Sequence, residues 1–199
     1  MGLQKNVVET LVSTPIKWIN FSFANRLISP VGYYYIASMV SGGSIKCAVD
    51  AGMGHTASYD VKNNTITAND GSYGETYFDE KALLVHECTH AILDIFYKGR
   101  DMNGGASAGI TVLEDETIAY IAQGMYIVAA NGASPGNSSL PDYEAYYLVK
   151  DKLKAIMKKG WTGCDTIEFS SSDAADLQTS IKLNSLYKNS YSGIAVHDG

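Results

Sequence analysis

The segment LLVHECTHAILD, residues 83–94, contains two histidines four positions apart, with a glutamate directly after the first. On an α-helix, residues four apart lie on one face, so the His86 and His90 imidazoles can reach the same metal ion. Glu87 lies about 100° further round the helix axis and flanks that ion. Imidazole is a common zinc ligand, and an adjacent carboxylate can take a proton from water held by the metal. The spacing therefore predicts a hydrolytic metal site.

The residues around this motif predict a buried helix. Asp79 and Glu80 stand near its expected N-terminus, where carboxylates interact favourably with the helix dipole, and Gly99 is expected to end it. The competing interpretation is an amphipathic helix with two ordinary histidines. A glutamate directly after His86, in an otherwise apolar helix, favours the metal site. On the side away from the histidines the helix carries an apolar stripe: Leu84, Cys88, Ala91 and Ile95.

A third metal ligand is expected downstream, because zinc hydrolases usually use three protein ligands and keep the fourth position for water. Glu116 is the best candidate, within a second helical segment at residues 113–130. Glu114 and Asp115 are alternative ligands. A further alternative is that the acidic triplet is only a charged first turn of the helix. The apolar remainder of the segment indicates burial, where an unpaired carboxylate is costly. The residues expected on the same face as Glu116 are Tyr120, Gln123 and Ile127.

The two segments together resemble the gluzincin, or thermolysin-like, branch of zinc metallopeptidases. In that family HExxH is completed by a glutamate on a following helix, and HECTHAILD followed by DETIAY is similar to this pattern over residues 83–123. The resemblance implies one Zn²⁺ ion bound by His86, His90 and Glu116. It implies Glu87 as the general base and proton shuttle. The expected activity is that of a zinc metallopeptidase, a hydrolase.

The same resemblance implies residues that support the metal ligands. Asp115 occupies the position where the thermolysin pattern has an asparagine beside a ligand histidine, and Asp94 matches an aspartate of that pattern. Tyr120 departs from the pattern, which has an aspartate there to orient the other histidine. The partner of one imidazole is therefore left open.

The chemistry of the motif gives a mechanism for peptide-bond hydrolysis. Zinc lowers the pKa of its bound water toward about 7, and Glu87 accepts the proton as that water attacks the carbonyl. Glu87 then passes the proton to the leaving amine. The developing oxyanion needs a further donor, typically a tyrosine or histidine in gluzincins. The candidates are Tyr143, Tyr146, Tyr147 and His197.

Two other classes of function compete with this reading. The first is a non-catalytic or latent zinc-binding interaction protein with a zincin-like fold, in which His197 could close the site as a fourth ligand. Glu87 argues against it, because a structural zinc site has no need of a general base. The second is a helical binding module without a metal. Zinc content near one equivalent would exclude it.

Composition limits the partners. The chain has 199 residues, 46% of them hydrophobic, which is ample for a core. Its net charge of −6, with no basic cluster longer than Lys158-Lys159, disfavours nucleic acid. The resemblance to gluzincins implies a peptide or protein substrate. The longest apolar run, residues 31–40, is too short to span a bilayer. The residues specify neither an oligomeric state nor a cleavage sequence.

The N-terminus shows no secretory signal, so a cytoplasmic protein is the default expectation, although an exported chain whose leader was removed would read the same. The cysteines lack CxxC spacing, and a Cys47–Cys164 disulfide is conceivable in an oxidising compartment.

The expected fold class is α+β and mainly helical, with a small antiparallel sheet and an HExxH active helix in a zincin-like domain. A single domain, residues 1–199, is expected to comprise an N-terminal helical region at 1–43, the sheet and metal-site helices at 44–130, and a C-terminal helical region at 142–199. Helices are expected at 6–27 with an interruption near Pro15, and at 30–40, 142–159 and 172–188.

Strands are expected at residues 44–51, 57–61 and 65–68. In gluzincins a strand above the zinc lends its edge to the extended substrate, and residues 65–68 are the candidate by position. An interior hairpin strand is the alternative. The glycine-rich residues 98–111 are interpreted as a connector rather than a cap on the cleft. The N-terminal region is expected to pack beneath the core rather than across the cleft, because Trp18, Phe21 and Phe23 favour burial.

Overall fold

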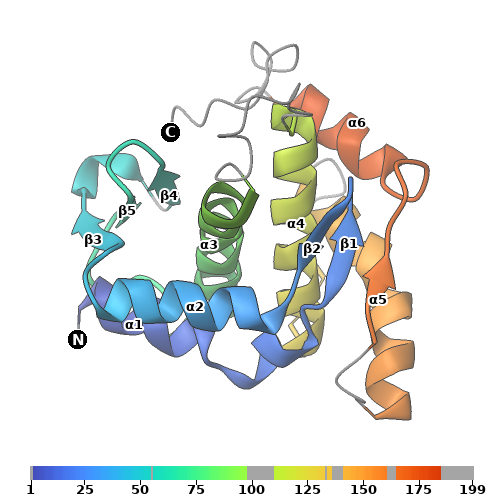
Figure 1. The fold of residues 1–199 in the computed structure, drawn as a ribbon, viewed down its shortest axis with the longest axis horizontal. Coiled ribbons are helices and arrows are strands. Elements are labelled where there is room, and N and C mark those ends of the chain that lie inside the picture. Colours follow the sequence, from blue (N-terminus) through green and yellow to red (C-terminus); the bar gives the residue numbers. More distant parts are fainter. Residues whose placement is uncertain are drawn as a thin grey trace.

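The computed structural model describes residues 2–54, 56–97, 110–132, 134–135, 141–160 and 165–184. These residues form a mainly helical α+β structure, which confirms the expected fold class at this level. Helices α3 (Phe78–Tyr97) and α4 (Val112–Ala129) pack against each other at its centre (Figure 1). α1 (Leu3–Leu11) and α2 (Pro30–Ser41) run together across one end of α3 in this view.

The C-terminal helices cover the other side of α4. α5 (Pro141–Lys159) and α6 (Ala175–Leu183) both contact α4, and α5 follows the expected helix closely. Pro at the first position, acidic residues in the first turn and lysines in the last turn all favour α5 where it lies. Gly160 follows with φ of +83°, a left-handed conformation that suits glycine and stops the helix. Beyond α6, residues 185–188 of the expected helix lie outside the described residues.

Two small sheets flank the helices, each with three strands. The first has the order β2-β1-β6, and the second has the order β3-β5-β4. Each combines one antiparallel pair with one parallel pair. The antiparallel pairing of β4 with β5 is confirmed, whereas the parallel pairing of β3 with β5 makes the expected antiparallel sheet a mixed one. The strands are β1 (Phe21–Phe23), β2 (Arg26–Ile28), β3 (Lys46–Val49), β4 (Ala57–Asp60), β5 (Thr65–Ala68) and β6 (Ile167–Glu168).

The hairpin of β1 and β2 corrects the expectation of a helix as far as residue 27. The helix ends at Leu11, and a 3₁₀ helix (Thr14–Trp18) begins beside Pro15 before the chain turns extended. Phe21 and Phe23 are buried while Ser22 between them is half-exposed, the alternation of a strand with one face on the core.

β5 is the central strand of its sheet, hydrogen-bonded to β3 on one side and to β4 on the other. The expectation that residues 65–68 offer a free edge to substrate is therefore wrong, and the alternative of an interior strand holds. The edge strands are β3 and β4, and β4 contacts α3. The β4–β5 hairpin turns at Asn64, whose positive φ of 49° is one that asparagine tolerates well.

The N-terminal helices pack on α3 along the side that carries Thr89 and Ile92. The Tyr33 hydroxyl of α2 lies 2.7 Å from the Thr89 hydroxyl, which in turn donates to the Val85 carbonyl at 2.7 Å. A Cβ on Gly32 would lie 3.1 Å from Ile92 Cδ1, so the glycine allows the two helices to approach closely. These contacts support the expectation that this region packs against the core.

We expect removal of residues 1–40 to unfold the protein rather than to release an activity. Two single substitutions, at adjacent residues of the N-terminal region, test with less disruption whether this region stabilises the fold. Leu11 is fully buried and Val12 is 55% exposed. Leu11→Ala should lower the free energy of unfolding by about 2–5 kcal/mol, and Val12→Ala should change it by no more than about 0.5 kcal/mol. Urea denaturation of both variants measures this. A folded truncation with new hydrolytic activity would identify residues 1–40 as an inhibitory segment.

Candidate metal centre

Three potential metal ligands from α3 and α4 converge in the structure. His86 and His90 lie one turn apart on α3, and Glu116 lies in the second turn of α4. One donor atom from each lies within 4.8 Å of the other two. His86 Nε2 is 3.4 Å from Glu116 Oε2, and His90 Nε2 is 3.7 Å from Glu116 Oε1. The three side chains are only 4%, 8% and 12% exposed, respectively.

The residues present fit a divalent metal ion. Two ligand atoms about 2.1 Å from one tetrahedral zinc ion lie about 3.4 Å apart. The two histidine–glutamate distances, 3.4 Å to Oε2 and 3.7 Å to Oε1, are near this value, and one donor atom from each residue lies within 4.8 Å of the others. Glu116 Oε2 is buried and has no hydrogen-bond partner among the described residues. Such an oxygen costs about 1–3 kcal/mol when it is left unsatisfied, a cost that a bound cation removes. Two imidazoles with one carboxylate suit zinc and other first-row divalent ions.

The acidic triplet at the start of α4 divides into three roles. Glu114 forms a capping box with Thr111: the Thr111 side chain accepts from the Glu114 backbone N–H, and Glu114 Oε2 accepts from the Thr111 N–H at 2.9 Å. This helix cap directs Glu114 back toward the first turn. Asp115 lies beside His90, and Glu116 lies between the two histidines. Of the three alternatives, the structure brings Glu116 to both imidazoles.

Asp115 contacts His90 on the ring nitrogen that faces away from the ligand cluster. Its Oδ2 is 2.9 Å from His90 Nδ1, and both side chains are buried. Burial alone would lower the pKa of His90, but the Asp115 and Glu116 carboxylates outweigh it and raise the pKa to about 10. A proton held on Nδ1 leaves Nε2 as the nitrogen that faces the ligand cluster. The position of Asp115 is the one expected of a supporting carboxylate.

His86 has a different supporting group, which the sequence left open. Its Nδ1 lies 2.9 Å from Gln123 Oε1, and Gln123 Nε2 donates to Asp142 Oδ1 at 3.1 Å. Tyr120, at the position where the family pattern has an aspartate, packs edge-on against the His86 ring with centroids 4.5 Å apart. Gln123 could have been suspected as an isolated amide on the Glu116 face of an apolar helix. No sequence feature marks Asp142 as part of the site, because an aspartate in a first helical turn is common.

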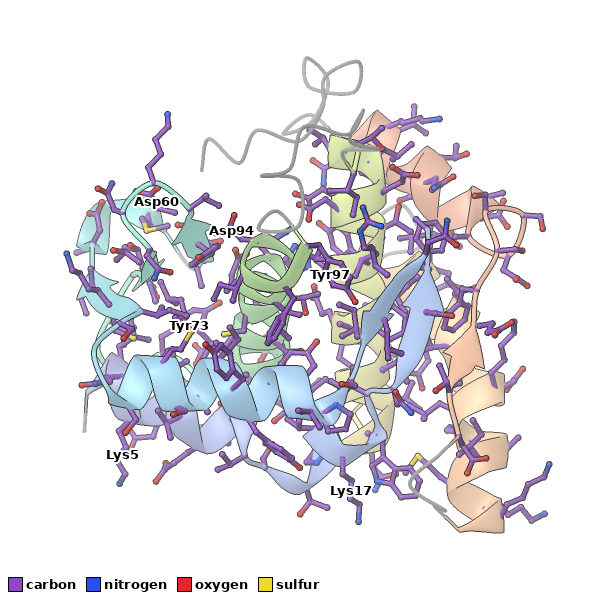
Figure 2. The ribbon with its side chains drawn as sticks, in the orientation of Figure 1. Lys5, Lys17, Asp60, Tyr73, Asp94 and Tyr97 are labelled. Carbon is purple, nitrogen blue, oxygen red and sulfur yellow. The ribbon has the colours of Figure 1, made fainter. Side chains whose placement is uncertain are left out.

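Asp94 lies one turn beyond His90, on the side of α3 that faces the sheet. The Tyr59 hydroxyl of β4 donates to Asp94 Oδ2 at 3.5 Å and to Asn64 Oδ1 at 2.8 Å. Figure 2 shows Asp94 between α3 and β4. This contact connects α3 to the hairpin. A role for Asp94 beside a ligand histidine stays a prediction.

Glu87 is buried where α3 meets the edge strand β4. Its Oε2 accepts a hydrogen bond of 2.9 Å from the backbone N–H of Tyr59. Burial raises the pKa of Glu87, against the lowering effects of the nearby His86 and His90 and of the Tyr59 N–H. A carboxylate whose pKa lies above its ordinary value is a better proton acceptor at neutral pH. The structure thus places a fixed, buried carboxylate next to the ligand cluster.

The three tyrosines considered as oxyanion donors all lie on α5 and have different surroundings. Tyr146 is buried in the core, whereas Tyr147 is 45% exposed and packs against Tyr143. His197 and Cys164 lie outside the described residues, as do residues 98–109 of the expected connector. The choice of oxyanion donor stays a prediction.

Cys47 is a free thiol, and burial raises its pKa to about 11.

No family model, curated protein or solved structure matches the chain. The resemblance to gluzincins stays a prediction from the two sequence motifs. Among the helices of the described part of the chain, none is long and apolar enough to cross a membrane.

Proposed function

We propose that the protein is a zinc-dependent metallopeptidase that hydrolyses peptide bonds at the centre formed by His86, His90 and Glu116. The observation that carries the proposal is the convergence of these donors beside a buried Glu87. A site built only to hold a metal needs no such carboxylate, because structural zinc sites usually close with a fourth protein ligand. The Nδ1 contacts of both imidazoles add support, since ligand histidines are commonly oriented in this way.

A bound zinc ion would supply a Lewis acid and a water molecule made acidic enough to react near neutral pH. Glu87 accepts the proton of the attacking water and delivers it to the leaving amine. The Tyr59 N–H holds Glu87 Oε2, which restricts rotation of the carboxylate and leaves Oε1 as the oxygen for proton transfer. Burial favours this task, because it raises the pKa of the carboxyl group.

An extended peptide fits beside the edge strand. β4, at the margin of its sheet, borders α3 at Glu87, and a peptide running along it would bring a scissile bond near the general base. β5 cannot take this role, because both of its edges are already paired within the sheet. The proposed substrate class is therefore a peptide or an extended segment of a protein.

Cleavage of a mixed peptide library by the zinc-loaded protein tests the proposal. We expect zinc near one equivalent, cleavage detected by mass spectrometry, and inhibition by a hydroxamate that binds without removing the metal. Calorimetry of the hydroxamate with zinc-loaded and metal-free protein separates metal-dependent binding from adsorption. Zinc binding with neither cleavage nor hydroxamate binding would favour the non-catalytic or latent zinc-binding alternative. If the protein takes up no zinc, both the metallopeptidase proposal and the zinc-binding alternative are contradicted.

A further inference from the structure

A chain of polar contacts leads from the metal centre out to α5. It runs from His86 on α3 through Gln123 on α4 to Asp142 in the first turn of α5. We propose that Gln123 and Asp142 are positioning residues that fix the proton of His86 on Nδ1 and keep Nε2 free for the metal. The role in metal binding rests on the proposed function, whereas the placement of the proton can be tested without it.

The direction of the chain follows from which atoms can donate. Burial raises the pKa of Asp142, against the lowering effects of His86 and of the Gln123 hydrogen bond. While its carboxylate is ionised it only accepts hydrogen bonds, so Asp142 Oδ1 requires the donor side of the Gln123 amide, Nε2. The amide oxygen Oε1 then faces His86, and it can pair with Nδ1 only if that nitrogen carries the proton. A neutral imidazole protonated on Nδ1 has its lone pair on Nε2, the nitrogen that lies 3.4 Å from Glu116.

The opposite orientation of the amide would be incompatible with metal binding. Rotating the Gln123 amide by half a turn would place its oxygen against Asp142 Oδ1, two acceptors about 3.1 Å apart. It would also present a donor to His86 Nδ1 and shift the imidazole proton to Nε2, where a metal ligand must have a lone pair. Asp142 therefore selects the binding-competent state of His86 through the orientation of an amide.

The two histidines thus have partners of different charge. His90 contacts the Asp115 carboxylate directly, whereas His86 contacts a neutral amide that a carboxylate holds in place. A fourth carboxylate in direct contact would add to the negative charge of Glu87, Asp115 and Glu116 in one buried site. The amide supplies the same acceptor without that added repulsion.

Close packing of α4 and α5 makes the chain possible. A Cβ on Gly124, next to Gln123, would lie 2.8 Å from the Ala145 carbonyl oxygen, so only glycine allows this approach of the two backbones. Asp142 lies in the turn of α5 just before Ala145. α5 therefore contributes to the metal centre, although it provides no proposed ligand.

The inference can be tested by exchanging the amide of Gln123 and the carboxylate of Asp142 between the two positions. Asp142→Asn keeps the size of the side chain but can donate as well as accept, so both amide orientations of Gln123 become satisfied and the preference for Nδ1–H is lost. Adding Gln123→Glu restores the preference, because the new carboxylate accepts from His86 and from Asn at position 142. Gln123→Leu removes the partner altogether. Asp151→Asn, exposed on the same helix, is the control for loss of a charge.

We expect Gln123→Leu to weaken zinc binding by about 10–100-fold, measured by competition with a chromophoric chelator. Asp142→Asn should weaken it less, and the double variant should bind zinc more tightly than Asp142→Asn alone. The NMR signal of the proton on His86 Nδ1, followed in both zinc-loaded and metal-free protein, should be weakest in Gln123→Leu and weakened in Asp142→Asn. It should recover in the double variant. A merely structural role predicts no recovery in the double variant.

The two measurements separate the inference from the proposed function. Wild-type zinc affinity and an unchanged Nδ1–H signal in Gln123→Leu and Asp142→Asn would overturn the positioning role. If the wild type bound no zinc, the proposed function would fail, and the Nδ1–H signal of the metal-free variants would still decide whether Gln123 and Asp142 place the proton.

Discussion

Glu87→Gln should lower the rate of peptide hydrolysis by a factor on the order of a hundred or more, while fold and zinc content stay unchanged. The glutamine oxygen can still accept from the Tyr59 N–H, as the Glu87 carboxylate does at 2.9 Å, so the side chain keeps its place beside β4. An amide cannot accept the proton of the attacking water at neutral pH. The loss therefore isolates the proton transfer from the geometry of the site.

Two further variants make the result specific. Glu87→Asp keeps a base but shortens its reach, so we expect a loss of activity smaller than that of Glu87→Gln. Tyr59→Phe removes the hydroxyl that contacts Asp94 and Asn64 but keeps the backbone N–H that holds Glu87. It should therefore leave turnover near the wild-type rate. Initial rates on one cleaved peptide measure all three, and equal rates for the wild type and Glu87→Gln would reject Glu87 as the base.

The sequence predicts the local part of this site well, because the information lies within single helices. Spacing of four residues places His86 and His90 on one face whatever the rest of the fold does. The acidic first turn likewise places the start of α3 correctly, and α4 lies within one residue of the expected 113–130 at each end. The expected end of α3 at Gly99 lies outside the described residues. Glu114 could have been set aside from the sequence, because Thr111 and Glu114 have the T-x-x-E spacing of the capping box that the structure forms.

The parts that escaped prediction depend on contacts between segments distant in the chain. Asp142 reaches the centre only because Gly124 lets α5 lie directly against α4, and nothing in the local pattern around either residue indicates this. The parallel pairing of β3 with β5 skips over β4, so β3 and β4 follow each other in the sequence but are not neighbours in the sheet. The β1–β2 hairpin was taken for helix because its two strands have only three residues each, too few for a clear period of two.

Loss of any one of the three proposed ligands should remove most of the bound zinc. His86→Ala, His90→Ala and Glu116→Ala each delete a donor from a cluster whose atoms lie within 4.8 Å of one another, and two remaining donors bind the ion much more weakly. Metal content after dialysis against a weak chelator measures the effect. We expect each variant to retain little zinc under conditions where the wild type keeps about one equivalent.

Glu114 provides the matched control, two positions before Glu116 on the same helix. Glu114→Gln removes the same charge as Glu116→Gln, and its amide can still accept from the Thr111 N–H and so preserve the helix cap. We therefore expect full zinc content in Glu114→Gln and a large loss in Glu116→Gln, at similar free energies of unfolding for the two metal-free proteins. The reverse pattern would mean that α4 presents a different carboxylate to the histidines, and it would remove the geometric basis for placing Glu87 beside the ion.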